Sequence, residues 1–79
     1  MVIMEQMLIN INTEYIKLDQ LLKFSGIAES GVDAKDMILS EMVSYNGELC
    51  AMRGKQVRAG DTVTIEFEDE TVEITVGAE

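Results

Sequence analysis

Three stretches of the chain alternate apolar and polar side chains, which is the pattern of a strand with one buried face. In the first stretch, Met7, Ile9 and Ile11 form the apolar set. Two further stretches, Thr-Val-Thr-Ile-Glu-Phe (62–67) and Thr-Val-Glu-Ile-Thr-Val (71–76), repeat the pattern, and the acidic residues 68–70 between them indicate a turn. We therefore expect one strand near the N-terminus and a pair of strands near the C-terminus.

Between these strands the apolar spacing changes to that of helices. Leu18, Leu21 and Leu22 lie at positions i, i+3 and i+4, which places them on one helical face, and Gly26 is suited to end this short helix. A second helix is expected after Ser30, whose side chain can cap it together with an aspartate three residues later. Its apolar stripe consists of Ala34, Met37, Ile38 and Met42.

Two turn signals complete the outline of the fold. Asn46-Gly47 predicts a tight hairpin, because both central positions of such a turn need positive φ, and Gly60-Asp61 predicts a turn into strand 62–67. The element order is a strand, two helices and then several antiparallel strands. We expect a single α+β domain over residues 1–79, with two short helices packed on a small, curved antiparallel sheet of four to five strands.

The charge of the chain is unevenly distributed. The net charge is −9, but residues 61–79 account for −7 of it and contain no basic residue. All six basic residues lie between positions 17 and 58, and three of them, Arg53, Lys55 and Arg58, fall within six positions. The total acidity therefore leaves room for a local positive face, and the acidic C-terminal part is interpreted first as a solvated surface.

Composition excludes the commoner kinds of catalytic and metal site. The chain has no histidine, a single cysteine, no glycine-rich phosphate loop and no spacing typical of metal ligands. Glu68, Asp69 and Glu70 lie together, but in a predicted turn, where solvated carboxylates are the simpler interpretation. We expect a protein without catalytic activity or cofactor. The sequence lacks a signal peptide and a long apolar run, which favours a cytoplasmic protein with no membrane partner.

The basic residues are the chemistry that this sequence offers. Lys17 precedes the first predicted helix, Lys35 lies near the start of the second, and the 53–58 cluster lies between the hairpin and the last two strands. Phosphate recognition uses long cationic side chains that converge from separate elements, together with free backbone N–H groups at a helix N-terminus. Spacing alone leaves both possibilities open, since six scattered cations need not meet.

The ordered motifs resemble the S4 RNA-binding domain, also called the alpha-L motif, and above all its small stand-alone bacterial members. The segments that carry the resemblance are YIKLDQLLKFSGIAESGVDAKDMIL, VSYNGE and RGKQVRAGDTV, which together span about residues 15–66. They supply a basic residue before Leu-Asp, a helix ended by glycine, a serine at the second helix, an Asn-Gly hairpin and a Gly-Asp turn. Gly31, Met52 and Gln56 stand where members often have cations.

The resemblance implies a ribosome-associated module that binds structured RNA, ribosomal RNA in the first place, without catalysis. Carried over by position, the RNA-binding residues would be Lys17, Ser30, Lys35, Arg53, Lys55 and Arg58, with Lys23 and Gln56 in addition. The alternative is a module of the same fold that docks a basic protein through its acidic strands, residues 62–76. A monomer is the default expectation for the oligomeric state.

Overall fold

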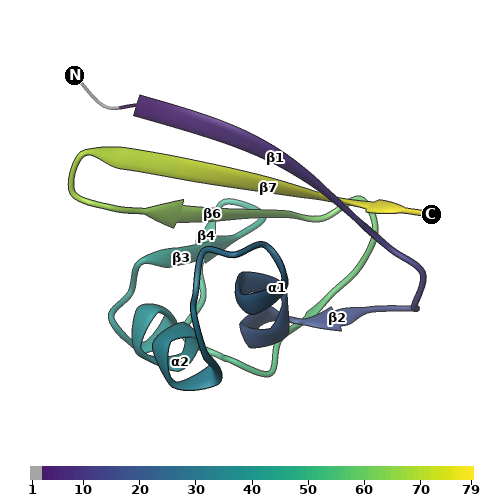
Figure 1. Cartoon of the computed structure of the whole chain (residues 1–79), viewed down its shortest axis with the longest axis horizontal. Coiled ribbons are helices and arrows are strands. Elements are labelled where there is room, and N and C mark those ends of the chain that lie inside the picture. Colours follow the sequence, from purple (N-terminus) through teal and green to yellow (C-terminus); the bar gives the residue numbers. More distant parts are fainter. Residues whose placement is uncertain (1–2) are drawn as a thin grey trace.

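The computed structural model describes residues 3–79, so residues 1 and 2 of the expected domain lie outside the described part. A five-stranded sheet has the strand order β1-β7-β6-β3-β4, a two-stranded ribbon pairs β2 with β5, and both helices lie under one face of the larger sheet (Figure 1). The α+β class is confirmed. In chain order the elements are β1 (Ile3–Ile11), β2 (Ile16–Lys17), α1 (Leu18–Phe24), α2 (Gly31–Leu39), β3 (Val43–Tyr45), β4 (Glu48–Leu49), β5 (Gln56–Val57), β6 (Thr62–Glu66) and β7 (Glu70–Ala78).

One part of the expected sheet was wrong, because the sheet is mixed and not purely antiparallel. β6 pairs antiparallel with both β7 and β3, as a hairpin and its neighbour should. β1, however, pairs parallel with β7, in a register that runs from Ile3 opposite Glu70 to Ile11 opposite Ala78. Alternation shows which face of a strand is buried but carries no information on strand direction, and the long connection through the helices makes a parallel return possible.

The core lies between the helices and the sheet. Leu18, Leu21 and Leu22 of α1 are fully buried, as their helical spacing predicted, and Ile65 and Ile74 face them from the sheet. On the α2 side and in the remaining strands, the buried apolar residues include Ala34, Met37, Ile38, Val43, Val63, Val72 and Val76. The sequence patterns therefore predicted most of the core. Met7, Ile9 and Met42 are only partly buried, and Met42 lies outside the second helix, because α2 ends at Leu39.

The turns form for the reasons that the sequence suggested. Gly26 has φ +84° after α1, and Asn46 and Gly47 both have positive φ in the β3–β4 hairpin. At the start of α2, the hydroxyl of Ser30 accepts the backbone N–H of Asp33 at 3.1 Å, and the carboxylate of Asp33 accepts the backbone N–H of Glu29 at 3.1 Å. This is a capping arrangement in which aspartate reaches back one residue beyond the cap.

Two further observations concern membrane spans and metal sites. Within residues 3–79, no helix has the length and apolar character needed to cross a membrane. The same residues contain no group of three or more histidine, cysteine, aspartate or glutamate side chains arranged to hold a metal ion.

Candidate nucleic-acid interface

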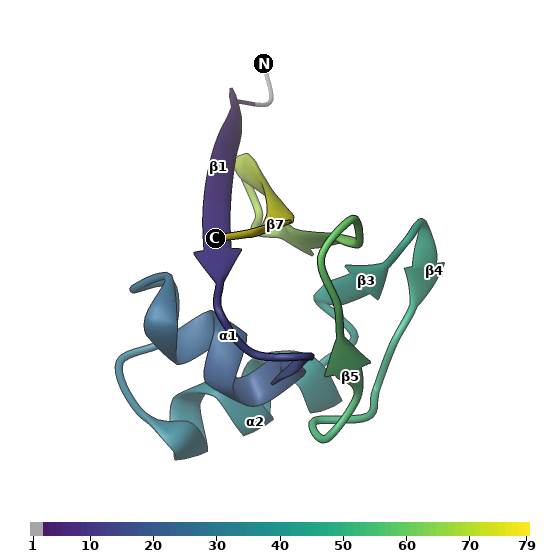
Figure 2. The same cartoon turned by 90° about the vertical axis from the view of Figure 1, so that its right-hand side faces the viewer.

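The basic segment, defined as Arg53–Arg58, is held against the start of α1 by backbone hydrogen bonds. β5, inside this segment, pairs antiparallel with β2, so that Lys17 lies directly opposite Gln56. The backbone N–H of Leu18 donates to the carbonyl of Lys55 at 2.9 Å, and the N–H of Asp19 donates to the carbonyl of Arg53 at 3.1 Å. Figure 2 shows β5 running beside the chain that leads into α1. Main-chain pairing therefore brings a cation from residue 17 beside those of residues 53–58.

Aromatic rings support two cations of the basic segment. The Lys55 ammonium lies 4.7 Å from the centroid of the Tyr45 ring, and the Arg58 guanidinium lies 5.8 Å from that of Tyr15. Such contacts orient a long cationic side chain while leaving part of its charge exposed. Tyr15 directly precedes β2 and Tyr45 lies in β3. The two contacts therefore hold the basic segment against both strands.

The guanidinium of Arg58 has polar partners that an incoming phosphate would have to replace. It contacts the carboxylate of Glu14 at 3.1 Å and the side-chain oxygen of Gln56 at 3.3 Å. The side chains of Arg58 and Glu14 are 50% and 80% exposed, so this ion pair is solvated and contributes little to stability. Arg58 is thus held in place without being buried.

Asp61 fastens the end of the basic segment to the β3–β4 hairpin. Its carboxylate accepts hydrogen bonds from the backbone N–H of Arg58 (2.9 Å), from the side-chain amide of Asn46 (3.2 Å) and from the hydroxyl of Tyr45. The side-chain oxygen of Asn46 in turn accepts the backbone N–H of Thr62 at 2.8 Å. The Gly60-Asp61 and Asn46-Gly47 motifs, which the sequence suggested only as turns, are therefore parts of one hydrogen-bonded unit.

The Tyr45–Asp61 hydrogen bond shifts the pKa values of both groups. Partial burial alone would raise the pKa of Asp61, but the hydrogen bonds from Tyr45, Arg58 and Asn46 favour the carboxylate, and the net effect lowers the pKa below its usual value. The hydrogen bond to Asp61, followed by partial burial, raises the pKa of the Tyr45 hydroxyl. Asp61 is therefore charged, and Tyr45 neutral, at physiological pH.

The other predicted site residues lie on the helices. Lys23 is in the last turn of α1, Lys35 is in α2, and both are exposed, but none of the described contacts joins them to the basic segment. The hydroxyl of Ser30 caps α2, which gives this residue a structural role. The structure thus brings together five of the eight candidates: Lys17, Arg53, Lys55, Gln56 and Arg58. RNA binding by all eight candidates stays a prediction.

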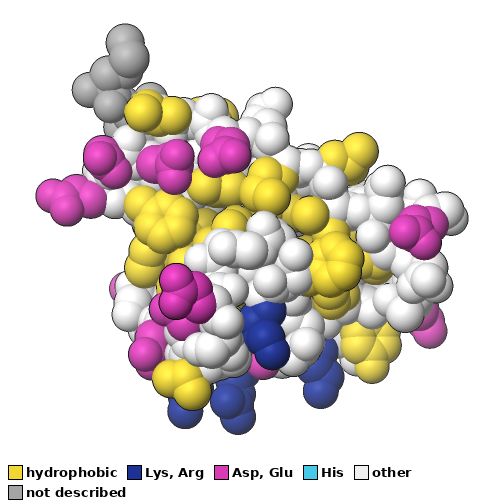
Figure 3. Space-filling view, in the orientation of Figure 1, with side chains coloured by type: hydrophobic (Ala, Val, Ile, Leu, Met, Phe, Trp, Pro, Cys, Tyr) yellow, Lys and Arg dark blue, Asp and Glu magenta, His cyan; other side chains and the backbone are white. Residues whose placement is uncertain are grey.

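The charges are unevenly distributed over the surface. In Figure 3 the visible Lys and Arg side chains lie in the lower part, over the helices and β2. Asp and Glu side chains gather at the upper left, over the β6–β7 turn and the start of β1, and others lie over the helices and at the right. The residues at that acidic end include Glu5, Glu68 and Asp69, all exposed. The protein therefore has a basic side in spite of its net charge of −9.

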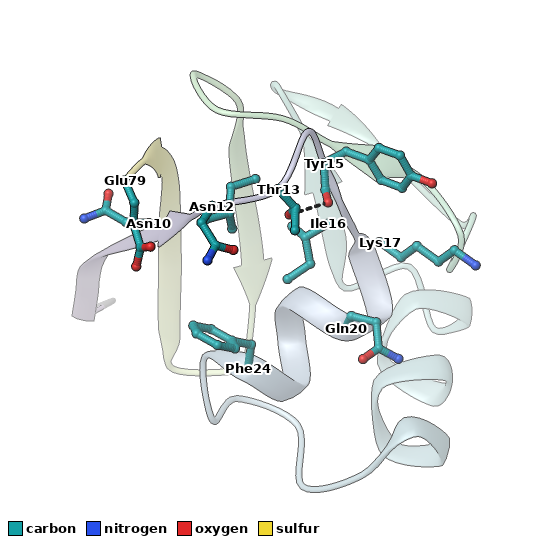
Figure 4. Close-up of a pocket in the computed structure, with 10 residues that line it drawn as sticks. Asn10, Asn12, Thr13, Tyr15, Ile16, Lys17, Gln20, Phe24 and Glu79 are labelled. Carbon is teal, nitrogen blue, oxygen red and sulfur yellow. Dashed lines mark hydrogen bonds between the residues drawn. The ribbon is translucent and has the colours of Figure 1, made fainter.

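A groove of about 550 Å³ adjoins the basic segment through Lys17 (Figure 4). It runs between the end of β1 and the exposed side of α1. Its lining combines carboxamides, aromatic rings, aliphatic side chains, one cation and one carboxylate, and includes Asn10, Asn12, Gln20, Tyr15, Phe24, Lys17 and Glu79. The side chain of Phe24 is 68% exposed, which is unusual because phenylalanine is most often buried. Sequence reasoning missed this groove, although Phe24 lies off the Leu18–Leu22 stripe and could have indicated an exposed aromatic ring.

The comparisons with known proteins agree with this geometry. The family profile described as "S4 domain" matches residues 9–75. The chain is also similar to the "Probable ribosome maturation protein RlbA" of Bacillus subtilis (strain 168), with 40% identity over 58 residues that cover 73% of this chain and 82% of that protein. The resemblance expected from residues 15–66 is confirmed. The chain belongs to the S4 domain family.

Proposed function

We propose that this protein binds structured RNA, and ribosomal RNA in the first place, through the basic segment and Lys17. The observation that carries the proposal is the backbone pairing of β2 with β5, which fixes Lys17 beside residues 53–58 without depending on flexible side chains. A pre-formed row of cations loses less conformational entropy on binding a phosphate backbone than scattered cations would.

The chemistry of the surface fits recognition by shape and not by base sequence. A-form RNA presents its phosphates and 2′-hydroxyls, while its base edges lie in a deep, narrow groove. Arg53 and Arg58 can hold a phosphate with two parallel N–H donors, whereas Lys17 and Lys55 act as point charges. Arg58 would exchange Glu14 for phosphate, which is a small cost because that ion pair is exposed.

The groove beside Lys17 gives the same surface a place for an unpaired nucleotide. A phosphate held by Lys17 would leave its base within reach of the groove, where Phe24 offers a stacking face and the carboxamides of Asn12 and Gln20 offer donors and acceptors. Unpaired bases are the part of a folded RNA that protein side chains can read. We infer that RNA with a bulge or loop next to a duplex is preferred.

The cellular role that follows is assistance in ribosome maturation, in the cytoplasm and without catalysis. It rests on the similarity to the ribosome maturation protein of B. subtilis and on the S4 domain itself. A small acidic protein with one basic side suits transient binding, because the remaining surface repels the RNA and only one orientation is allowed.

A second candidate function is the docking of a basic protein on the acidic end. The gathering of acidic side chains over the β6–β7 turn and the start of β1, at the opposite end of the molecule from β2, favours it (Figures 1 and 3). The two functions are compatible in one molecule, but they predict different binding partners.

Titration of the purified protein against fragments of ribosomal RNA, at salt concentrations from about 50 to about 300 mM, separates the two. If roughly four phosphates are contacted, log K falls with log salt at a slope of about −3. Salt-sensitive binding to a basic ribosomal protein, with no RNA binding at about 50 mM salt, would favour the protein partner and contradict the RNA proposal.

A further inference from the structure

β1 is an edge strand whose outer side is free. It ends the strand order β1-β7-β6-β3-β4, and in Figure 1 no element formed by residues 3–79 lies beyond it. The N–H of Ile3 donates to the carbonyl of Asp69 at 3.2 Å, and the carbonyl of Ile11 accepts the N–H of Glu79 at 3.0 Å. Odd-numbered residues of β1 therefore direct their backbone groups towards β7. The even-numbered residues Met4, Gln6, Leu8 and Asn10 direct theirs outwards, away from the sheet.

This edge has few of the features that protect edge strands from pairing. Exposed edges in natural proteins usually contain lysine, proline or a bulge, or they are short. β1 is nine residues long, pairs with β7 without interruption, and contains neither proline nor lysine; Glu5 is its single charged residue. Met4 and Leu8 are 61% and 66% exposed. An apolar, regular and open edge of this length is suited to accept another strand.

We propose that the occupant is β1 of a second copy, paired antiparallel with Gln6 on the two-fold axis. Only even-numbered residues carry outward backbone groups, so only they can form the hydrogen-bonded pairs of this seam. Centring the seam on Gln6 places Met4 opposite Leu8 of the second copy, and Leu8 opposite its Met4. These three pairs provide about six backbone hydrogen bonds. They also place Met4 and Leu8, the exposed apolar side chains on the sheet face away from the helices, beside each other across the seam.

The charges of β1 agree with self-pairing in this register. Glu5 lies opposite Met7 of the second copy, and the two Glu5 side chains are only diagonal neighbours, about 7–8 Å apart. Glu73, which lies beside Gln6 on β7, is separated from its equivalent by three strand spacings, roughly 14 Å, beyond the screening length at physiological salt. In this register β1 is complementary to a second β1. An unrelated strand would need the same arrangement of apolar and charged residues by chance.

The dimer formed in this way is weak and leaves the basic segment free. Pairing of one strand edge buries less than the ~800 Å² per partner of a stable complex, so we expect a dissociation constant on the order of 100 µM. The outer edge of β1 and the β2–β5 ribbon lie on different parts of the molecule (Figures 1 and 2). Dimerisation is therefore independent of the proposed RNA binding.

Sedimentation equilibrium of the whole chain, from about 5 to about 500 µM, tests the proposal with register-specific variants. Met4→Lys and Leu8→Glu should each weaken self-association at least about tenfold, because each places a charge opposite an apolar side chain. Mixed one to one, they should associate within about threefold of the wild type, since the new lysine then faces the new glutamate while Leu8 still faces Met4. Thr75→Lys on β7, one strand in from the edge, should have no effect.

Gln6→Pro supplies a second test that preserves the fold. It removes an outward N–H on the axis but no hydrogen bond to β7, so circular dichroism and thermal unfolding should show a folded protein that no longer dimerises. A wild type that stays monomeric at about 500 µM would overturn the proposal. So would a mixture of Met4→Lys and Leu8→Glu that associates no better than either variant alone.

Discussion

The carboxylate of Asp61 accepts the backbone N–H of Arg58 at 2.9 Å, and this contact ties the last cation of the basic segment to the turn that follows it. Tyr45 and Asn46 donate to the same carboxylate. The candidate RNA surface and the β3–β4 hairpin are therefore held by one acidic side chain, which gives an aspartate a structural role in a region that otherwise gathers positive charge.

Removing this carboxylate should loosen both the fold and the surface. Asp61→Ala leaves three donors without their acceptor, and we expect a loss of about 2–3 kcal/mol in the free energy of unfolding. Urea denaturation measures it. Asp69→Ala, which removes an exposed carboxylate from the β6–β7 turn, is the matched control and should change the free energy of unfolding by less than about 0.5 kcal/mol. Equal effects of the two substitutions would show that Asp61 has no special role.

The lowered pKa of Asp61 predicts how stability depends on pH. A carboxyl group whose pKa is lower in the folded state stabilises the fold fully above its ordinary value of 3.8, and this contribution is lost as pH falls through the folded-state pKa. The difference in unfolding free energy between the wild type and Asp61→Asn should therefore be constant near neutral pH and shrink below about pH 4. Denaturation curves from about pH 7 to about pH 2 provide the measurement; a difference that grows on acidification would contradict the assignment.

Two glycines near the basic segment should respond differently to alanine. Gly60 has φ +97°, which a side chain rarely tolerates, whereas Gly54 has no positive φ and no atom within 4 Å of an added Cβ. Gly60→Ala should lower the free energy of unfolding by about 1–2 kcal/mol, and Gly54→Ala should change it by less than about 0.5 kcal/mol or raise it slightly. Thermal unfolding of the two variants makes the comparison, and a larger loss from Gly54→Ala would be inconsistent with the turn described here.

The exposed ring of Phe24 should matter for unpaired nucleotides only. Stacking of a base on an aromatic ring contributes about 1–3 kcal/mol, so Phe24→Ala should weaken binding of a hairpin RNA with a single-nucleotide bulge by roughly fivefold or more. Binding of the fully paired hairpin should not change. Leu39→Ala, which trims an exposed apolar side chain on α2, is the control and should affect neither RNA. Fluorescence anisotropy with both hairpins measures it; equal losses on both would argue against the groove as a base site.

The sequence predicted where helices and strands lie along the chain better than it predicted which strands pair. The spacing of Leu18, Leu21 and Leu22 and the alternation around Ile65 and Ile74 determine which face is buried, because burial of an apolar face dominates local structure. The parallel partner of β1 was missed, since direction depends on the path of the whole chain.

The candidate site was predictable in part for the same reason. Residues 53–58 form a cluster in the sequence, so their shared location was evident. The pairing that adds Lys17 joins segments far apart in the chain. The supporting rings come from Tyr15, in the loop before β2, and from Tyr45 in β3. Such contacts arise from tertiary packing and leave no local pattern.

The most direct test of the central claim is the salt-dependent affinity for ribosomal RNA fragments of the triple variant Arg53→Ala, Lys55→Ala, Arg58→Ala. A control with the same change in net charge is Gln6→Glu, Thr75→Glu, Ala78→Glu, at exposed positions of β1 and β7. We predict that the first variant loses at least about tenfold in affinity and that its slope of log K against log salt falls by about 2, while the control stays close to the wild type. Equal binding by the wild type and the first variant would contradict the account.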